Sequence, residues 1–225
     1  PPSGWGARHT ARKPMLVIPS LITTLFAASP ALPAPAPVEP EEVVMDAGSK
    51  LYLELGLEGS LPAEAFLDAL ERREAKRESG HILAIADFSR PSTEKRLYII
   101  DLEARQLVLR TYVAHGANTG ELYAEHFSNR EGSHQSSLGL YRVGAEIVSP
   151  KHGAALLLHG LDRGVNDKAL EREIIMHGAD YVSEAFIAEH GRLGRSWGCP
   201  AVPREHMQRL VTLLADGGLL FVYGG

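Results

Sequence analysis

Cys199 is the residue of this sequence with the strongest capacity for covalent chemistry. It is the only cysteine among 225 residues, so it has no partner for an intramolecular disulfide and no companions for a cysteine-rich zinc site. The flanking Gly198 and Pro200 are typical of a turn. A cysteine nucleophile needs a base, and an apolar run ending in His177-Gly178 supplies a candidate 22 positions earlier. The alternative is an inert buried thiol and an unrelated core histidine.

Other groups in the turn around Cys199 could take part in chemistry at a nucleophilic cysteine. We expect the backbone N–H groups across Trp197, Gly198 and Cys199 to stabilise a tetrahedral oxyanion, and Gly198 permits the close approach or positive φ of such a turn. Trp197 is a candidate wall that excludes water, and Arg195 is a candidate for binding a substrate carboxylate through its planar guanidinium. A plain turn glycine, a packed tryptophan and a surface arginine are the structural alternatives.

Ten histidines raise the question of a metal site. His115 and His159 each end an apolar run and precede a glycine, as His177 precedes Gly178, so we include His115, His159 and Gly178 among candidate substrate-binding positions. No His-Glu-x-x-His motif is present. We therefore predict neither a metal nor an organic cofactor, and a zinc amidase or peptidase is a minor alternative.

The stretch from about Asp87 to Tyr223 resembles the L,D-transpeptidase catalytic domain, in the branch of the YkuD-type superfamily that ends in Ser-Trp-Gly-Cys-Pro-Ala. The resemblance covers well over half of the chain, with its segments in order. They are residues 91–97, 115–120, 127–129, 136–141, 160–162, 164–167, 176–182 and 194–200.

The resemblance implies a cysteine enzyme that acts on peptidoglycan stem tetrapeptides. Cys199 would form a thioester with release of D-alanine, and an amine acceptor would resolve it. His177 would be the base, held by a backbone carbonyl, which leaves Asp180 as a helix cap. Ser196 would orient the histidine or bind the acyl group, or act only as a turn residue. Acylation by β-lactams such as carbapenems is also implied.

Two departures from the superfamily pattern affect this reading. Trp197 replaces a second histidine, and Ala201 replaces an arginine two residues after the cysteine. If that arginine binds a substrate carboxylate in the superfamily, then in this chain Arg195 or Arg204 must bind it, or the contact is absent. The same residues would also serve a thiol hydrolase, either an L,D-carboxypeptidase or an endopeptidase. An inactive cell-wall-binding scaffold is an alternative of another class.

Composition and patterning indicate an exported globular protein. Hydrophobic residues make up 44% and charged residues 23%, while a net charge of −5 without a basic stripe argues against nucleic acid as a partner. Residues 1–36 have the basic, apolar and small-residue order of a signal peptide with an upstream extension, and the apolar run is too short to span a bilayer. We expect a Pro/Ala-rich linker over 37–45, a helical lead-in over 46–80 and the catalytic domain over 81–225. The predicted location is the periplasm or the cell wall outside the membrane.

Short apolar runs predict a mainly β protein. About seven strands are expected, over residues 81–87, 96–102, 106–113, 138–143, 154–159, 173–177 and 219–223. Helices are expected over 62–77 with Ser60 as cap, over 179–190 with a buried stripe, and over 204–215. The fold class is therefore a YkuD-type β-sandwich or barrel with a few peripheral helices. The polar loop 120–137 is a candidate lid on the acceptor side, or a plain surface loop.

Overall fold

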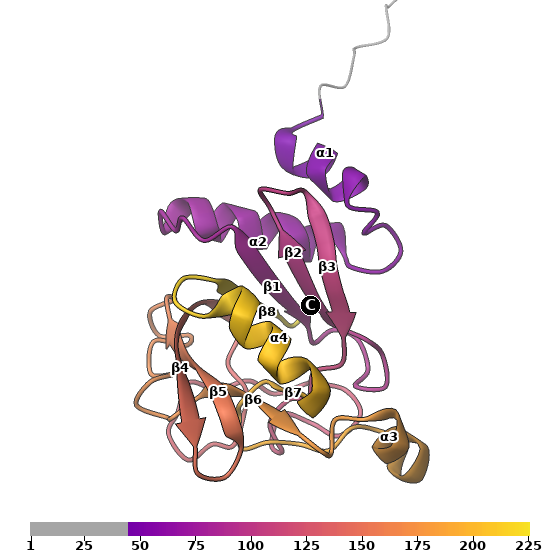
Figure 1. Ribbon diagram of the computed structural model, residues 1–225, viewed down its shortest axis with the longest axis vertical. Coiled ribbons are helices and arrows are strands. Elements are labelled where there is room, and N and C mark those ends of the chain that lie inside the picture. The colour runs from indigo at the N-terminus through magenta and orange to yellow at the C-terminus, as the bar shows by residue number, and fades with distance from the viewer. Residues whose placement is uncertain (1–44) are drawn as a thin grey trace, which may run out of the picture. The chain divides into compact units, whose positions relative to one another are not determined.

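The computed structural model describes residues 45–225 (Figure 1). The predicted signal peptide and nearly all of the predicted linker lie outside this part of the chain. The described residues form eight strands and four helices. The elements are α1 (Ala47–Glu54), α2 (Ala63–Ala75), β1 (Ile82–Asp87), β2 (Leu97–Asp101), β3 (Gln106–Thr111), β4 (Gly139–Ser149), β5 (Gly153–Gly160), β6 (Ile175–Ala179), α3 (Glu184–His190), β7 (Ala201–Pro203), α4 (Arg204–Leu214) and β8 (Leu219–Tyr223).

All eight strands join one sheet in the order β3-β2-β1-β8-β4-β5-β6-β7. Neighbouring strands are antiparallel except for the parallel pairs β1–β8 and β6–β7. Just past β3, Ala114 forms an antiparallel bridge with Ala201 of β7, with N···O distances of 2.8 and 3.3 Å. This bridge connects the two ends of the strand order, so the sheet nearly closes into a barrel. The predicted mainly β barrel with peripheral helices is confirmed.

The strands next to the helices are buried on both faces. Along β1, Ile82, Ala84 and Ala86 pack in one core cluster with α4, while Leu83 and Ile85 pack in a second cluster with α1 and α2. The side-chain alternation of a strand explains this division. Figure 1 shows α4 beside β5, β6 and β7. Because both faces are covered, β1 reads in the sequence as a continuous apolar run.

The seven predicted strands are confirmed, and one further strand is present. The short β7 was missed because its three residues follow Pro200, end in Pro203 and carry no alternation. β4 extends six residues beyond its predicted end, to Ser149, because it continues as an exposed hairpin paired with β5. The helix α1 falls within the predicted helical lead-in over 46–80, but no separate helix was predicted there, although Asp46 caps it by accepting a hydrogen bond from Ser49 N–H.

Two helix predictions need correction. The segment predicted as a helix over 179–190 begins instead at Glu184, capped by Ser183, and no residue within α3 is buried. The predicted stripe is therefore wrong, because the apolar contact is made by Val182 before the helix starts. Ser60 does not cap α2, since its hydroxyl donates to Leu57 O. α4 is confirmed with its buried apolar face.

Arg96 is the largest side chain that is wholly buried in the described residues. Its guanidinium donates to Val113 O at 3.1 Å and Arg90 O at 2.6 Å, and lies 2.8 Å from Nδ1 of His115. The group also lies 4.7 Å from the centroid of the Phe88 ring. These contacts connect β2 to the segment that follows β3, which is the segment that closes the barrel.

Replacing Arg96 by Met is expected to lower the free energy of unfolding by about 3 kcal/mol, because two backbone carbonyls and a histidine nitrogen lose their buried donor. Urea unfolding followed by circular dichroism measures the change. Arg130→Met, in an exposed loop position, is the control and is expected to change the free energy by less than about 0.5 kcal/mol. Equal stabilities of the two variants would contradict a structural role for Arg96.

Candidate active site

The parallel pairing of β6 with β7 brings the two predicted catalytic residues together. His177 in β6 pairs with Ala201 in β7, and Cys199 lies two residues before Ala201. The turn that carries Cys199 is held from the other side by a bridge between Gly116 and Ser196. Residues far apart in sequence therefore meet where β6, β7 and the segment after β3 run side by side.

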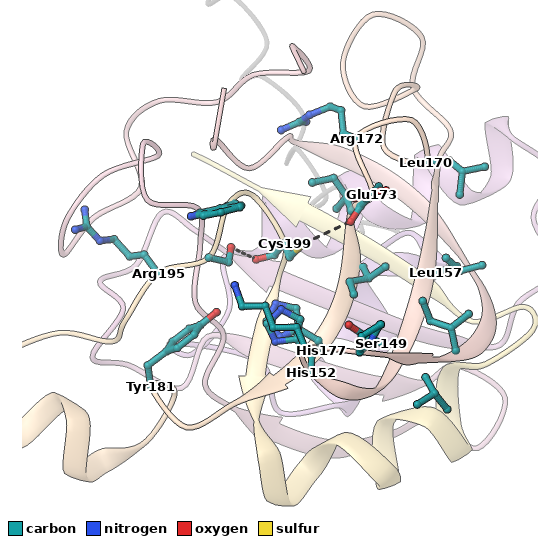
Figure 2. A pocket seen from close by; sticks show the side chains of 18 residues that line it. Ser149, His152, Leu157, Leu170, Arg172, Glu173, His177, Tyr181, Arg195 and Cys199 are labelled. Atoms are coloured by element: carbon teal, nitrogen blue, oxygen red, sulfur yellow. Dashed lines mark hydrogen bonds between the residues drawn. The ribbon is translucent and has the colours of Figure 1, made fainter. Parts of the chain in front are cut away.

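His177 and Cys199 line one cavity of about 670 Å³ (Figure 2). One part of its wall is polar, with His152, Tyr181 and Ser196 beside the two predicted catalytic residues. Another part is apolar and consists of Ile147, Val148, Leu157, Leu170, Ile174 and Ile175. A concave site with convergent polar groups on an apolar wall is typical of small-ligand binding.

The imidazole of His177 is oriented by the backbone. Its Nδ1 lies 3.2 Å from Gly178 O, so Nδ1–H donates to that carbonyl and Nε2 is left as the proton acceptor. Asp180 is not part of this arrangement, since its carboxylate pairs with Arg204 at 2.6 Å. Burial lowers the pKa of His177 to about 4, and the nearby His152, Lys151 and Arg204 act in the same direction. His177 is thus a neutral base at neutral pH.

The thiol of Cys199 is protonated in this arrangement. Burial raises its pKa, and the Ile175 N–H and the charge of Arg172 oppose this only in part. Sγ lies 3.9 Å from Glu173 O, a weak contact of the kind that a thiol donates. Burial of both groups favours the neutral pair over the ion pair.

Alkylation of Cys199 by iodoacetamide should show this directly. The rate constant is expected to rise with pH through a midpoint above that of the same single thiol in the urea-unfolded chain, because burial disfavours the thiolate. Mass spectrometry of the alkylated protein over a pH series measures the rate. A rate that levels off below pH 7 would contradict the neutral pair.

The hydroxyl of Ser196 organises the turn over residues 196–199, which carries the candidate nucleophile Cys199 and is called the nucleophile turn below. Its Oγ donates to Cys199 O at 2.6 Å and accepts from Gly198 N–H at 3.1 Å. Neither bond involves His177, so the structure places Ser196 within the turn. Gly198 has φ +123°, and a Cβ there would lie 2.8 Å from Gln135 O, which explains the need for glycine.

These bonds alter the expected set of oxyanion donors. The N–H of Gly198 is already bound to Ser196 Oγ. Among residues 45–225, the N–H groups of Trp197 and Cys199 make no hydrogen bond to another residue. Trp197 and Cys199 are therefore the remaining backbone donors at this turn.

Arg195 and Trp197, both predicted to contact substrate, line the cavity in different ways. The guanidinium of Arg195 donates to Glu121 at 2.6 Å and to the carbonyls of Ala117 and Gly120, and Figure 2 shows it directed away from Cys199. Trp197 is 69% exposed and stacks on His134 with ring centroids 5.0 Å apart. Trp197 thus forms part of the cavity wall. The guanidinium of Arg195 is instead bound to Glu121 and does not face Cys199.

His115, His159 and Gly178 do not line the cavity. His115 is buried behind the nucleophile turn, where Nε2–H donates to Gly120 O and its own carbonyl accepts from Ser196 N–H. Next to His159, a Cβ on Gly144 would lie 2.6 Å from His159 Nε2. Gly178 packs against α4. The shared pattern of a histidine before a glycine therefore does not mark a common cleft, since of the three histidines only His177 lines the cavity.

The sequence profile of the L,D-transpeptidase catalytic domain matches residues 59–223, which include both predicted catalytic residues and all eight strands. The chain belongs to this L,D-transpeptidase family. The match begins before α2, so the family's domain includes that helix as well as the barrel.

Several solved structures are similar to parts of this L,D-transpeptidase domain. One is an L,D-transpeptidase from Mycobacterium smegmatis, with 10% identity and a TM-score of 0.39 over 63% of this chain and 58% of that one. Another is from Stackebrandtia nassauensis, with 16% identity and a TM-score of 0.39 over 78% and 75%. A third is Bd1075 of Bdellovibrio bacteriovorus, with 16% identity and a TM-score of 0.41 over 64% and 48%.

The chain spans less than two thirds of the length of the first of these structures. No curated protein matches the sequence. Membership of the L,D-transpeptidase family therefore rests on the sequence match over residues 59–223. Within residues 45–225, no helix has the length and apolarity needed to cross a bilayer.

Sequence reasoning missed the tip of the β4–β5 hairpin, which lines the same cavity as His177 and Cys199. His152 stacks on His177 with ring centroids 3.7 Å apart and planes 26° apart. Lys151 Nζ lies 5.0 Å from the centroid of the Trp197 ring. These residues belong to no motif, because the hairpin reaches the site through a strand that continues six residues past its predicted end.

Tyr181 and Arg172 were also missed. The Tyr181 ring packs against Gly194, and Figure 2 shows its hydroxyl directed toward the cavity. Arg172 donates to Ser128 O, Ser137 Oγ, Ser133 Oγ and Gln135 O, and so fastens the loop 120–137 to the wall of the cavity. None of that loop lines the main cavity, although Glu131 and His134 border a smaller one on which Trp197 also lies.

The stacked His152 should help to keep His177 neutral. In His152→Ala, the pKa of His177 is expected to rise from about 4 toward 6.5, because the ring becomes more hydrated and loses a neighbour of like charge. NMR titration of the histidine Cε1–H resonances measures the midpoint. The exposed His126→Ala is the control, and an unchanged His177 midpoint in His152→Ala would refute this role.

Proposed function

We propose that the chain is a cysteine L,D-transpeptidase that acts on peptidoglycan stem tetrapeptides. The observation that carries the proposal is the meeting of Cys199 and the backbone-oriented His177 at one cavity. Membership of the L,D-transpeptidase family supports it. The substrate is a peptide in which the L-centre of a diamino acid is joined to a terminal D-alanine.

Acylation begins with a neutral pair. Nε2 of His177 takes the thiol proton as Sγ of Cys199 attacks the carbonyl carbon of the scissile bond. The N–H groups of Trp197 and Cys199 stabilise the oxyanion. The C–N bond then breaks, the imidazolium returns its proton to the nitrogen, and D-alanine leaves with its amine. A thioester on Cys199 remains.

Transfer repeats the sequence with an amine as nucleophile. His177 accepts a proton from the acceptor amine as it attacks the thioester, and the proton returns to Sγ when the C–S bond breaks. The products are a new amide and the free thiol. No step requires a metal or an organic cofactor. Attack by water instead would give the tripeptide acid, which is the outcome of an L,D-carboxypeptidase.

We place this reaction outside the cytoplasm, in the periplasm or at the cell wall. The support is the order of basic, apolar and small residues over 1–36, which is typical of a signal peptide. The same thiol is expected to open the ring of a carbapenem and to retain it as a covalent adduct. The adduct is expected because the β-lactam ring, like the scissile peptide bond, contains an amide carbonyl carbon that the thiol can attack.

The decisive experiment incubates the full chain with purified disaccharide-tetrapeptide and identifies products by mass spectrometry. A cross-linked dimer that lacks one D-alanine is expected, and Cys199→Ala is expected to abolish it, because no thioester can form. His177→Gln should lower the acylation rate at least about 100-fold, in the range of a lost general base. His126→Ala is the control.

Other outcomes point elsewhere. Tripeptide alone would identify a hydrolase. No product and no mass increase of the wild-type chain with substrate or carbapenem would refute the enzyme proposal. Binding of that inert chain to purified sacculi would then favour a cell-wall scaffold.

A further inference from the structure

The cavity is lined by more basic than acidic residues, although the chain as a whole is acidic. Its wall contains Lys151, Arg172 and Arg195 but a single acidic residue, Glu173, while the chain as a whole has a net charge of −5. A concave wall of one charge concentrates ligands of the opposite charge. The cavity is therefore suited to a group with a negative charge.

The arginines near the site already have partners. Arg172 is bound to two carbonyls and two hydroxyls of the loop 120–137. Arg195 is bound to Glu121 and two carbonyls. Arg204, the other residue considered from sequence, pairs with Asp180 through two bonds and does not line the cavity. None of the three has an uncommitted guanidinium facing substrate.

Lys151 differs from these arginines. It makes no ion pair or hydrogen bond with any residue between 45 and 225, and its Nζ lies over the ring of Trp197. A cation over an aromatic face is held in place while its N–H donors stay available. Its neighbour His152 stacks on His177, so the hairpin tip is anchored at the site on both sides.

We propose that Lys151 binds the free carboxylate of the C-terminal D-residue of the donor peptide. This inference rests on the proposed function. The carboxylate lies one residue beyond the attacked carbonyl, so its partner must lie a short distance past the nucleophile. Lys151 lines the same cavity as Cys199, and its Nζ lies 5.0 Å from the ring centroid of Trp197, which is two residues before Cys199 in the chain. Lys151 would thus supply the positive charge that is lost where Ala201 replaces the arginine of the superfamily pattern.

A substrate pair tests the assignment. Release of the C-terminal D-residue is measured for the disaccharide-tetrapeptide and for its C-terminal amide, with wild type, Lys151→Met, Lys151→Arg and the distant control Lys50→Met. For the acid, Lys151→Met is expected to raise KM about tenfold and to leave kcat within about twofold, since a charged hydrogen bond present in both ground and transition states is lost. For the amide, wild type and Lys151→Met should be equal. Lys151→Arg should keep most of the preference for the acid.

Alkylation of Cys199 tests the same charge without any peptide. The ratio of the iodoacetate rate to the iodoacetamide rate compares an anion with its neutral isostere. This ratio is expected to fall about fivefold in Lys151→Met and to stay at the wild-type value in Lys50→Met.

The turnover and alkylation experiments distinguish the proposed reaction from the proposed carboxylate site at Lys151. A fall in the alkylation ratio without turnover of any peptide would support a carboxylate site and refute the proposed reaction. Turnover in which Lys151→Met keeps the full preference for the acid, or an unchanged alkylation ratio, would overturn the assignment to Lys151. Loss of kcat for acid and amide alike would also overturn it, because that result indicates a disturbed hairpin rather than a lost carboxylate partner.

Discussion

The site depends on backbone hydrogen bonds to one three-residue strand. β7 pairs in parallel with β6 on one side and bridges Ala114 on the other, so Ala201 is held between two segments that are distant in sequence. The first pairing sets the position of Cys199 against His177, and the second closes the barrel. Without the buried segment from Val113 to His115, which Arg96 fastens, β7 would be a free edge and the nucleophile turn would have no fixed position.

Burial has the largest effect on the pKa values of His177 and Cys199. It lowers the pKa of His177 and raises that of Cys199, and no nearby charge is close enough to reverse either direction. The enzyme proposed here would therefore hold its proton on sulfur until substrate arrives. A neutral thiol is less reactive toward solutes than a thiolate, which would suit the extracytoplasmic location proposed above, since the single cysteine has no disulfide partner.

The β4–β5 hairpin supplies a second constraint on the site. Its tip covers one face of His177 with His152 and places Lys151 on Trp197, so one turn restrains both the base and the wall beside the nucleophile. The loop 120–137 is restrained in a different way, through the guanidinium of Arg172. A substitution in the hairpin would therefore alter contacts of His177 and Trp197 directly. A substitution in the loop would act on the cavity only through Arg172.

Much of the fold was predictable from sequence, because seven strands and the helix α4 carry local apolar patterns that survive in the structure. Cys199 and His177 were proposed as nucleophile and base because a lone cysteine in a Gly-Pro turn and a histidine at the end of an apolar run are visible locally, and because their surroundings resemble a known family. The stripe assigned to 179–190 failed because Val182 packs before the helix begins, which periodicity alone does not show. β7 was missed because three residues carry no periodicity at all.

The rest of the site was decided by tertiary structure. Whether a histidine faces a cavity depends on which strands pair, and this is why His115 and His159 lie elsewhere while His152, which has no motif, stacks on His177. The availability of a cation depends on its neighbours, so Arg195 is committed to Glu121 and Lys151 remains available. The protonation state of Cys199 depends on burial, which is a property of the packed chain. The sequence by itself determined the residue types and the strands that carry them, since these follow from local patterns. Only the folded barrel decided which of those residues meet and with what charge, because contacts and solvent exposure are set by strand pairing across long separations.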